Sequence, residues 1–387
     1  MTISLHCPVC DGERWEPVLR LPAVPVAVGS LMSPRAVAVE AARGDIDLCV
    51  CGGCGLVRNL AFDPTAVDYA GDYESSQFCS ATFAEYARDL VARLVDRYGL
   101  AGGTVVDIGC GQGELLELFL QAGVRHGIGV DPGYTGERAE LERSGRLRVI
   151  RDPYLGQLAD VGAGLWCCRH VLEHVTDPAG LLTSIRDDAG RGTVYVEVPN
   201  GEFVLGDAGL WDVIYPHVSY FTASALRTMV ERCGLDVLDA RSDFGGQFLG
   251  VEAAPADRRN VTAATPEARS GRMRISAVAQ RFERIIHRWN TLISERDRYG
   301  TTVVWGAGSK SVTFLNSTVA GEIVDVVVDL NPRKHGSFIP GTGQEVIGPE
   351  ALRELRPATV VVMNANYEPE IRAQLGELGL DPQVLCA

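Results

Sequence analysis

The sequence predicts an α/β protein built around a doubly wound parallel sheet, with a small cysteine-bearing module in front and a second α/β domain behind. Three observations carry this prediction. Strand-like and helix-like stretches alternate between residues 69 and 254, which is the rhythm of a parallel sheet. A second alternating series opens at Thr301. Pairs of cysteines stand near both ends of the first 68 residues.

The composition is that of an ordinary globular chain and argues against two classes of partner. The 387 residues carry a formal net charge of −14, so a groove that tracks nucleic-acid phosphates is not expected. Apolar runs stay well short of the about 20 residues that cross a bilayer, and the first residues lack the regions of a signal peptide. The 11 cysteines, several inside apolar runs, are typical of a reducing compartment. We therefore expect a cytoplasmic monomer or homodimer with a small-molecule partner.

Residues 1–68 form the first predicted unit, a zinc-binding module. The stretch is poor in strand patterns and rich in proline and glycine, and a segment this short needs a staple to fold. Cys7 with Cys10, and Cys51 with Cys54, form two Cys-x-x-Cys pairs. Two such pairs supply the four thiolates of a closed tetrahedral zinc site, which indicates a structural role. Cys49 is a spare thiol that could compete for a position, and a set of free thiols is the alternative.

The second predicted unit, residues 69–254, contains a glycine-rich loop between a strand and a helix. The strand ends in Asp107, and Gly109, Gly111 and Gly113 follow before the helix. Such glycines let the backbone approach a ligand, and the helix N-terminus favours negative charge. The next strand ends at Asp131, where a carboxylate can bind both ribose hydroxyls. The glycine spacing differs from the dinucleotide pattern and so favours S-adenosylmethionine (SAM) over NAD; a plain strand–turn–helix connection is the alternative.

Two further polar segments follow strands of the same unit. Arg169, His170, Glu173 and His174 come after an apolar strand, at the edge where open α/β sheets bind ligands. His170 and His174 have the spacing of one helical face, which could suggest a metal, but no third ligand is evident and we favour pocket lining or packing. His217 stands in a loop with tyrosines on both sides. By residue type it is the best candidate for a general base; a packed aromatic-loop histidine is the alternative.

The rest of the chain is predicted as a linker with a long helix, residues 255–298, and a C-terminal α/β domain, residues 299–387. The helix spans residues 273–298 and has apolar residues at helical spacing. In the C-terminal domain Gly306, Gly308 and Lys310 follow the first strand, without the third glycine of a dinucleotide loop. A contact of Lys310 and the helix start with a pyrophosphate, or closure of the pocket, is one interpretation, and a purely structural turn is the other.

Together these stretches resemble the three-domain SAM-dependent sugar C-methyltransferases, which act on nucleotide-linked keto-deoxysugars. The resemblance covers nearly the whole chain. It is carried by the two cysteine pairs, residues 72–77, the glycine loop, residues 169–174, the aromatic loop around His217, and residues 305–310, 328–332 and 339–343. It implies a structural zinc module, a class I methyltransferase domain and a C-terminal Rossmann-like domain that close around a sugar nucleotide.

The resemblance also implies a reaction and roles for side chains. A base removes a proton from the carbon beside a ketone, and the enolate attacks the methyl group of SAM. The base falls on His217, assisted by Tyr215, and Tyr73 helps to shape the sugar site. We expect Arg169 and His170 to lie beside the cofactor.

One residue departs from the family pattern. Pro216 stands where the family places a glutamate, so the carboxylate that would orient or balance His217 is missing. Glu173, His174 or Asp212 could supply the partner. The departure keeps two alternatives open: an O- or N-methyltransferase of another sugar or natural-product small molecule, and a protein that binds SAM or a sugar nucleotide without catalysis.

Overall fold

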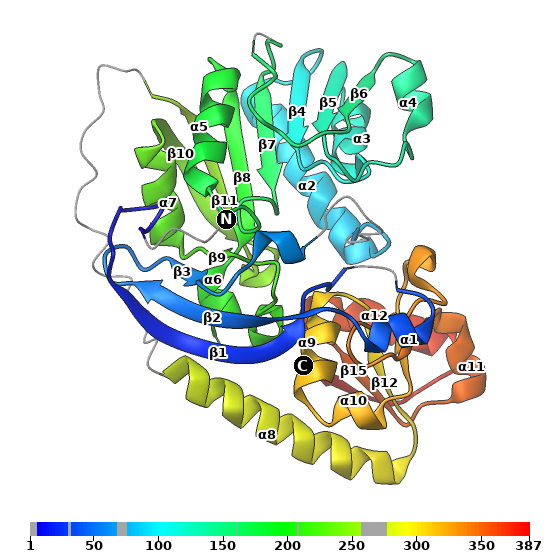
Figure 1. The fold of residues 1–387 in the computed structure, drawn as a ribbon. Helices are drawn as coiled ribbons and strands as arrows, with labels where there is room; N and C mark the ends of the chain where they lie inside the picture. Colours follow the sequence, from blue (N-terminus) through cyan, green and yellow to red (C-terminus); the bar gives the residue numbers. More distant parts are fainter. Residues whose placement is uncertain (1–5, 30–31, 68–75, 160, 207–208, 257–276) are drawn as a thin grey trace.

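The structure, a computed structural model, describes residues 6–29, 32–67, 76–159, 161–206, 209–256 and 277–387. Within these residues the strands form sheets of four, seven and five strands. In Figure 1 the seven-stranded sheet lies above the five-stranded sheet, and the long hairpin of the four-stranded sheet runs beside both. Tyr73 and most of the predicted linker lie outside the described residues.

The seven-stranded central sheet confirms the predicted doubly wound class. Its order is β10-β11-β8-β7-β4-β5-β6, and the strands from β8 to β6 pair in parallel. The strands are β4 (Thr104–Ile108), β5 (His126–Val130), β6 (Leu147–Ile150), β7 (Leu165–Arg169), β8 (Thr193–Pro199), β10 (Leu235–Asp243) and β11 (Phe248–Pro255). The helices are α2 (Ala81–Tyr98), α3 (Glu114–Gln121), α4 (Ala139–Arg143), α5 (Pro178–Ala189), α6 (Gly201–Val204) and α7 (Ala223–Arg232). Successive residues of β4 and β8 are buried, as in a sheet covered on both faces.

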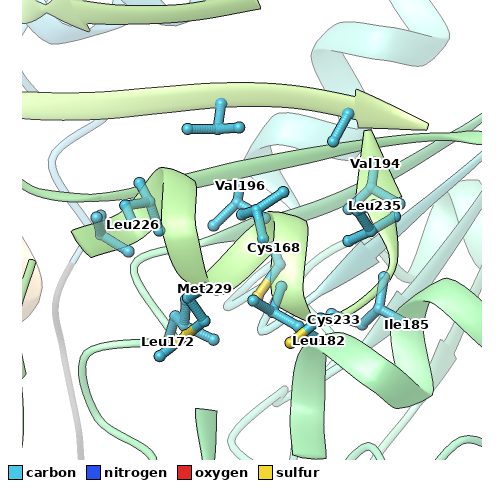
Figure 2. Packing of buried hydrophobic residues seen from close by; sticks show 14 of the residues in the cluster. Cys168, Leu172, Leu182, Ile185, Val194, Val196, Leu226, Met229, Cys233 and Leu235 are labelled. Atoms are coloured by element: carbon cyan, nitrogen blue, oxygen red, sulfur yellow. The ribbon is translucent and has the colours of Figure 1, made fainter. Parts of the chain in front are cut away.

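One face of the central sheet packs against α5 and α7. Figure 2 shows Cys168 and Val196 of the sheet together with Leu182 of α5 and Met229 of α7, and all four belong to one buried cluster. Cys168 is fully buried among apolar side chains, so this cysteine serves as a small core residue.

The order of the central strands creates a ligand-binding edge. The chain runs from β4 out to β5 and β6, then crosses to β7 and β8 on the other side. Ligands of such sheets bind outside the carboxyl ends of the strands, at the point where the winding direction changes. The glycine loop, Asp131 and residues 169–174 all stand at the carboxyl ends of β4, β5 and β7.

The N-terminal segment contains more strand than the sequence indicates. β1 (Trp15–Pro25) pairs with β2 (Arg43–Cys51), β2 pairs with β3 (Val57–Asn59), and β3 pairs with β9 (Ser219–Tyr220). α1 (Arg35–Val39) lies between β1 and β2. The expectation of a strand-poor segment is wrong because β1 contains three prolines, which argue against a central strand, yet β1 lies at the edge of its sheet, where proline is tolerated.

The C-terminal domain is a parallel sheet of Rossmann-like plan, in the order β14-β13-β12-β15-β16. Its strands are β12 (Thr302–Trp305), β13 (Val326–Val328), β14 (Glu345–Ile347), β15 (Thr359–Val362) and β16 (Gln383–Cys386). Its helices are α9 (Ser309–Ser317), α10 (Ala320–Ile323), α11 (Leu352–Leu355) and α12 (Glu368–Glu377). The predicted long helix is α8 (Val278–Arg296), which buries Phe282, Trp289 and Ile293 of its apolar stripe.

The two α/β domains touch directly and through the N-terminal sheet. Arg43 at the start of β2 donates to Asn316 Oδ1 at 3.1 Å in the C-terminal domain, while β3 pairs with β9 of the central domain. Gln247 and Asn364 exchange two side-chain hydrogen bonds, of 2.7 and 3.0 Å, across the domain interface. The predicted boundary at residue 68 remains a prediction, but the N-terminal sheet includes a strand from residues 219–220. No described helix is long and apolar enough to cross a membrane.

Candidate functional site

A cavity of about 880 Å³ lies between the central sheet and the C-terminal domain. Loops after β4, β5 and β7 line one side, and loops after β12, β13 and β15 line the other. The cavity brings together most of the side chains singled out from the sequence: Asp107, Gly109, Gly111, Asp131, Arg169, His170, Glu173, His174, Asp212, His217 and Lys310. Gly113 and Tyr215 are not part of its lining.

The glycine loop adopts backbone angles that favour glycine. Gly109, Gly111 and Gly113 have φ values of 72°, 54° and 81°, in the left-handed region. A Cβ on Gly109 would lie inside van der Waals contact with Val171 Cγ2, whereas a Cβ on Gly111 would meet only Glu114 Oε2, at 4.0 Å. Gly109 is therefore needed for close packing of two loops, and Gly111 leaves open space beside the backbone.

Asp131 is fixed by the loop that it faces. Its Oδ2 accepts the Gly111 N–H and its Oδ1 accepts the Gly133 N–H, both at 2.8 Å. Gln112 adds a bridge between the loops by donating to the Gly133 carbonyl at 2.9 Å. The carboxylate is thus held rigidly at the carboxyl end of β5, and each of its oxygens keeps a lone pair for a further donor.

Asp107 is a buried carboxyl at the end of β4. It is 3% exposed, and burial raises its pKa to about 7 although Arg169 pulls the pKa down. Asp131 and Glu114 lie close enough to raise it further. Such a carboxyl gains from a cationic group in the cavity, because a cation would offset the cost of burying its charge.

Arg169 and His170 line the cavity, but their charged atoms contact Glu197 of β8. Arg169 donates from Nε and Nη2 to Glu197 Oε1 at 3.0 and 2.7 Å, and His170 Nε2 lies 3.0 Å from the same oxygen. Tyr195 donates to Glu197 Oε2 at 2.6 Å, and Tyr86 donates to it as well. Glu197 is not among the site residues predicted from the sequence. The sequence feature that could have identified it is a carboxylate within the largely apolar strand 193–198, because a buried charge requires charged or hydrogen-bonding partners.

The segment after β7 is a turn and not a helix, so the helical pairing of His170 with His174 is wrong. His170 has φ 53°, an uncommon value for a non-glycine residue, and this conformation separates the two rings. His174 instead lies with Glu173 and His217, whose ligand-type atoms are all within 4.8 Å of one another. The His174 and His217 rings meet edge to face with centroids 4.9 Å apart.

His217 is a buried, neutral imidazole. It is 8% exposed, and burial, assisted by the nearby His174, lowers its pKa to about 3, while Glu173 acts in the opposite direction. Its Nδ1 has no hydrogen-bond partner among the described residues. An imidazole without a proton on one ring nitrogen is able to accept one.

Glu173 is the carboxylate that accompanies His217. It is 1% exposed, and neither of its oxygens accepts a hydrogen bond from the described residues. Burial acts to raise its pKa, but contacts with His170, His174 and His217 lower the pKa overall. The side chain of Asp212, another partner considered from the sequence, binds Lys310, with Oδ2 3.2 Å from Nζ, and Asp212 meets His217 through its backbone.

Tyr215 does not reach the cavity. Its hydroxyl accepts the Asp63 N–H at 2.9 Å, and its ring packs against Phe62 with centroids 5.4 Å apart. The reason is a turn at Tyr215 and Pro216, closed by a hydrogen bond of 3.2 Å from the His217 N–H to the Ile214 carbonyl. The turn directs Tyr215 into the N-terminal sheet, so the expected assistance to His217 is not supported by this geometry.

The cysteines of the N-terminal module gather as a metal-binding set. The Sγ atoms of Cys7, Cys10, Cys51 and Cys54 all lie within 4.8 Å of one another, with Cys7–Cys54 at 3.5 Å and Cys10–Cys51 at 3.4 Å. Tetrahedral zinc with Zn–S bonds of about 2.3 Å requires S–S separations of about 3.8 Å, so the set fits zinc. Cys49 is not in the set: its Sγ lies 3.9 Å from Asp47 Oδ1, and burial and Asp47 raise its pKa to about 11.

The zinc module also touches the segment that carries His217. Strand β3 begins at Val57, shortly after Cys54, and pairs with β9. The Asn59 N–H donates to the Val218 carbonyl at 3.0 Å, and the Val218 N–H donates to the Glu173 carbonyl at 2.8 Å. The backbone around His217 is therefore held between β3 and the turn that carries Glu173.

The C-terminal side of the cavity repeats the arrangement at Asp131. Asp329 Oδ2 accepts the Ala307 N–H at 2.7 Å, but it also contacts Lys334 Nζ at 3.2 Å. Lys310 reaches across the domain interface and donates to Gln247 at 3.4 Å, in addition to its contact with Asp212. This side of the cavity therefore contains two lysines whose partners are protein groups.

Comparison with known proteins identifies both large domains. Residues 81–240 match the methyltransferase domain family, and residues 259–380 match the C-methyltransferase C-terminal domain. The chain is 28% identical over 390 residues to the C-methyltransferase NovU of Streptomyces niveus, covering 95% of this chain and 91% of that protein. The chain is a SAM-dependent methyltransferase that carries a C-methyltransferase C-terminal domain. The fold class, the cofactor SAM and the fit of the four-cysteine set to zinc agree with the expectations from the sequence.

Two further similarities each cover only part of the chain. A ubiquinone biosynthesis O-methyltransferase of Pseudomonas paraeruginosa is 37% identical over 93 residues, which are 22% of this chain and 40% of that protein. The structure of magnesium protoporphyrin IX methyltransferase from Synechocystis, with bound S-adenosylhomocysteine (SAH), is 20% identical. It covers 49% of this chain and 91% of that one, with a TM-score of 0.38.

Proposed function

We propose that this methyltransferase methylates a carbon beside the ketone of a nucleotide-linked keto-deoxysugar, with His217 as the base. The observation that carries the proposal is the position of His217, a buried neutral imidazole in the same cavity as the glycine loop and Asp131. The cavity, of about 880 Å³, is in the upper part of the usual range for small-molecule sites, which suits a cofactor together with a second ligand.

The chain offers a complete set of groups for SAM, which when bound supplies an electrophilic methyl group. Asp131, oriented by the amides of Gly111 and Gly133, accepts the ribose hydroxyls. Asp107 faces the ammonium group of the methionine part, and the ammonium lowers the raised pKa of this carboxyl. Gly109, Gly111 and Gly113 allow the backbone to approach the ligand.

His217 performs the proton transfer. The ketone acidifies the neighbouring C–H, and His217 takes the proton while the C–H electron pair becomes the enolate. The enolate carbon then forms a bond to the methyl group, and the S–C electron pair leaves with SAH. Glu173 takes the part of the glutamate that Pro216 replaces: it lies beside His217 and offsets the positive charge that His217 gains.

The acceptor binds against the C-terminal domain. Lys310 and Lys334 line that side of the cavity, and a pyrophosphate would compete with Asp212 and Asp329 for them. An anionic group that displaces these two carboxylates would gain the charge of both lysines, which favours an anionic substrate over a neutral one in spite of the net charge of −14.

The test uses purified protein, SAM with a ¹³C-labelled methyl group, and a panel of TDP-linked 4-keto-6-deoxysugars. We expect a product heavier by one labelled methylene whose NMR correlations place the methyl on carbon, and its loss in His217→Asn. His287→Asn, on the exposed face of α8, is the matched control and keeps full activity. A methyl group on oxygen would replace the proposal by an O-methyltransferase. Intact SAM binding without any product would refute this substrate class.

A further inference from the structure

His170 stands between two buried carboxylates that come from different segments of the chain. Its Nε2 lies 3.0 Å from Glu197 Oε1, and its Nδ1 lies 3.6 Å from Glu173 Oε1. Both ring nitrogens therefore face an acid, and Glu197 and Glu173 are only 0% and 1% exposed. Neither contact has the geometry of a hydrogen bond, so the attraction is that of an ion pair, which a positively charged imidazolium makes with both carboxylates and a neutral imidazole does not.

The charges of this cluster balance only when His170 is protonated. Glu197 and Glu173 contribute two negative charges, and Arg169 supplies one positive charge through its contacts with Glu197. An imidazolium at His170 supplies the second. Burial acts to lower the pKa of His170, but the two carboxylates outweigh it and raise the pKa to about 9. The ring of His170 also lies against Phe248 of β11, with ring centroids 4.6 Å apart. The two carboxylates have further neighbours: Tyr86 of α2 and Tyr195 of β8 donate to Glu197, and His174 lies beside Glu173.

The backbone holds His170 in this place. Its φ of 53° lies in the left-handed region, and its N–H donates to the Glu197 carbonyl at 2.8 Å. An uncommon backbone conformation persists only where the surroundings fix it, and here it turns the ring of His170 between the two acids.

Glu173 depends on this charge. Its oxygens accept no hydrogen bond from the described residues, so nearby positive charge has to keep it ionised in a buried place. The nearest cation is His170, since His217 is neutral and burial also lowers the pKa of His174. Arg169 is directed to Glu197 on the other side of His170.

We propose that His170 is a positioning residue whose imidazolium keeps Glu173 ionised beside His217, so that Glu173 stabilises His217 when it accepts the substrate proton. The role in proton transfer rests on the proposed function; the charged state of the cluster does not. The assignment differs from the cofactor contact expected from the sequence, because both ring nitrogens of His170 already face protein carboxylates.

The first experiment needs no substrate. Protein labelled at the histidine ring carbons is titrated by NMR with SAH bound, and the seven histidine signals are assigned by single substitutions. We expect His170 to stay protonated at neutral pH, and Glu173→Gln and Glu197→Gln each to move its titration to clearly lower pH. Glu202→Gln, at an exposed position nearby in sequence, is the control. The proposal is overturned if His170 is neutral at pH 7, or if its titration is unchanged in both glutamate variants.

The second experiment measures exchange of the C–H beside the ketone in D₂O, with SAH and the best acceptor of the sugar panel. We expect His170→Gln to lower the exchange rate by about 10²-fold, the low end of the about 10²–10⁴-fold that general acid–base catalysis contributes, because His217 itself is retained, and we expect SAH affinity to stay unchanged. The double variant with Glu173→Gln should be no slower than Glu173→Gln alone, because the two residues act through one path. Weaker SAH binding in His170→Gln, or a double variant whose rate loss is the product of the two single losses, would refute the proposal that His170 acts through Glu173. If the parent protein exchanges no sugar, the proposed function fails, and the NMR titration still decides the state of His170.

Discussion

Two neighbouring glycines of the SAM loop allow the cost of a close contact to be measured against the cost of a backbone angle. Gly109→Ala and Gly111→Ala both place a Cβ on a residue in the left-handed region, at φ 72° and 54°. That conformation costs an L-residue about 1–2 kcal/mol. Only Gly109 adds a clash, because its Cβ meets Val171 while that of Gly111 meets open space. Overpacking of this kind costs about 1–3 kcal/mol more.

The expected destabilisation is therefore about 1–2 kcal/mol for Gly111→Ala and about 2–5 kcal/mol for Gly109→Ala. Each kcal/mol lowers the melting temperature of a domain of this size by about 2–4 °C, and calorimetry of the central domain transition resolves the two. Val171→Ala combined with Gly109→Ala should restore the stability lost to the clash but not the stability lost to the backbone angle. Equal shifts for the two glycines, or no recovery in the double variant, would refute the reasoning.

Two further predictions concern Asp107 and the zinc module. Because the pKa of Asp107 is raised from 3.8 to about 7, its contribution to the stability of the free protein is present below pH 4 and lost as the pH rises through about 7. The ammonium group of SAH lowers that pKa, so SAH binding should release a proton near pH 6 but not at pH 9, and Asp107→Asn should abolish the release. Calorimetry in buffers of different ionisation enthalpy measures the number of protons released. Proton release that persists in the variant would assign the proton to another group. Cys54→Ser should lose the bound metal and expose β9. A loss of about 1.4 kcal/mol in local stability would speed the amide hydrogen exchange of residues 217–220 about tenfold. Unchanged exchange in metal-free protein would show that the module does not support the site.

The parts of the fold that depend on local pattern were predictable. The alternation around Asp107 and Asp131 indicates parallel strands, and the carboxyl ends of such strands meet at one edge, which places both acids in one cavity. The two cysteine pairs are equally informative, because their spacing fixes two knuckles whatever lies between them.

The parts that depend on long-range packing were not predictable from the sequence. The local sequence does not indicate that β1 lies at the edge of a sheet, so its prolines predict a loop. The turn at Pro216 sends Tyr215 away from His217, and this direction is decided by the pocket around Phe62. Likewise Glu197 acquires its importance only when the sheet brings Arg169 and His170 to it.

The pairing of β3 with β9 joins residues 57–58 to residues 219–220, across more than a hundred residues of chain. Contacts between such distant segments form late, because the intervening chain must first fold to bring them together. During synthesis both cysteine pairs emerge with the first 54 residues, so zinc can bind long before the partner strand exists. The His217 segment is then the last edge added to a preformed sheet, and a nascent chain acquires its metal early and its base late.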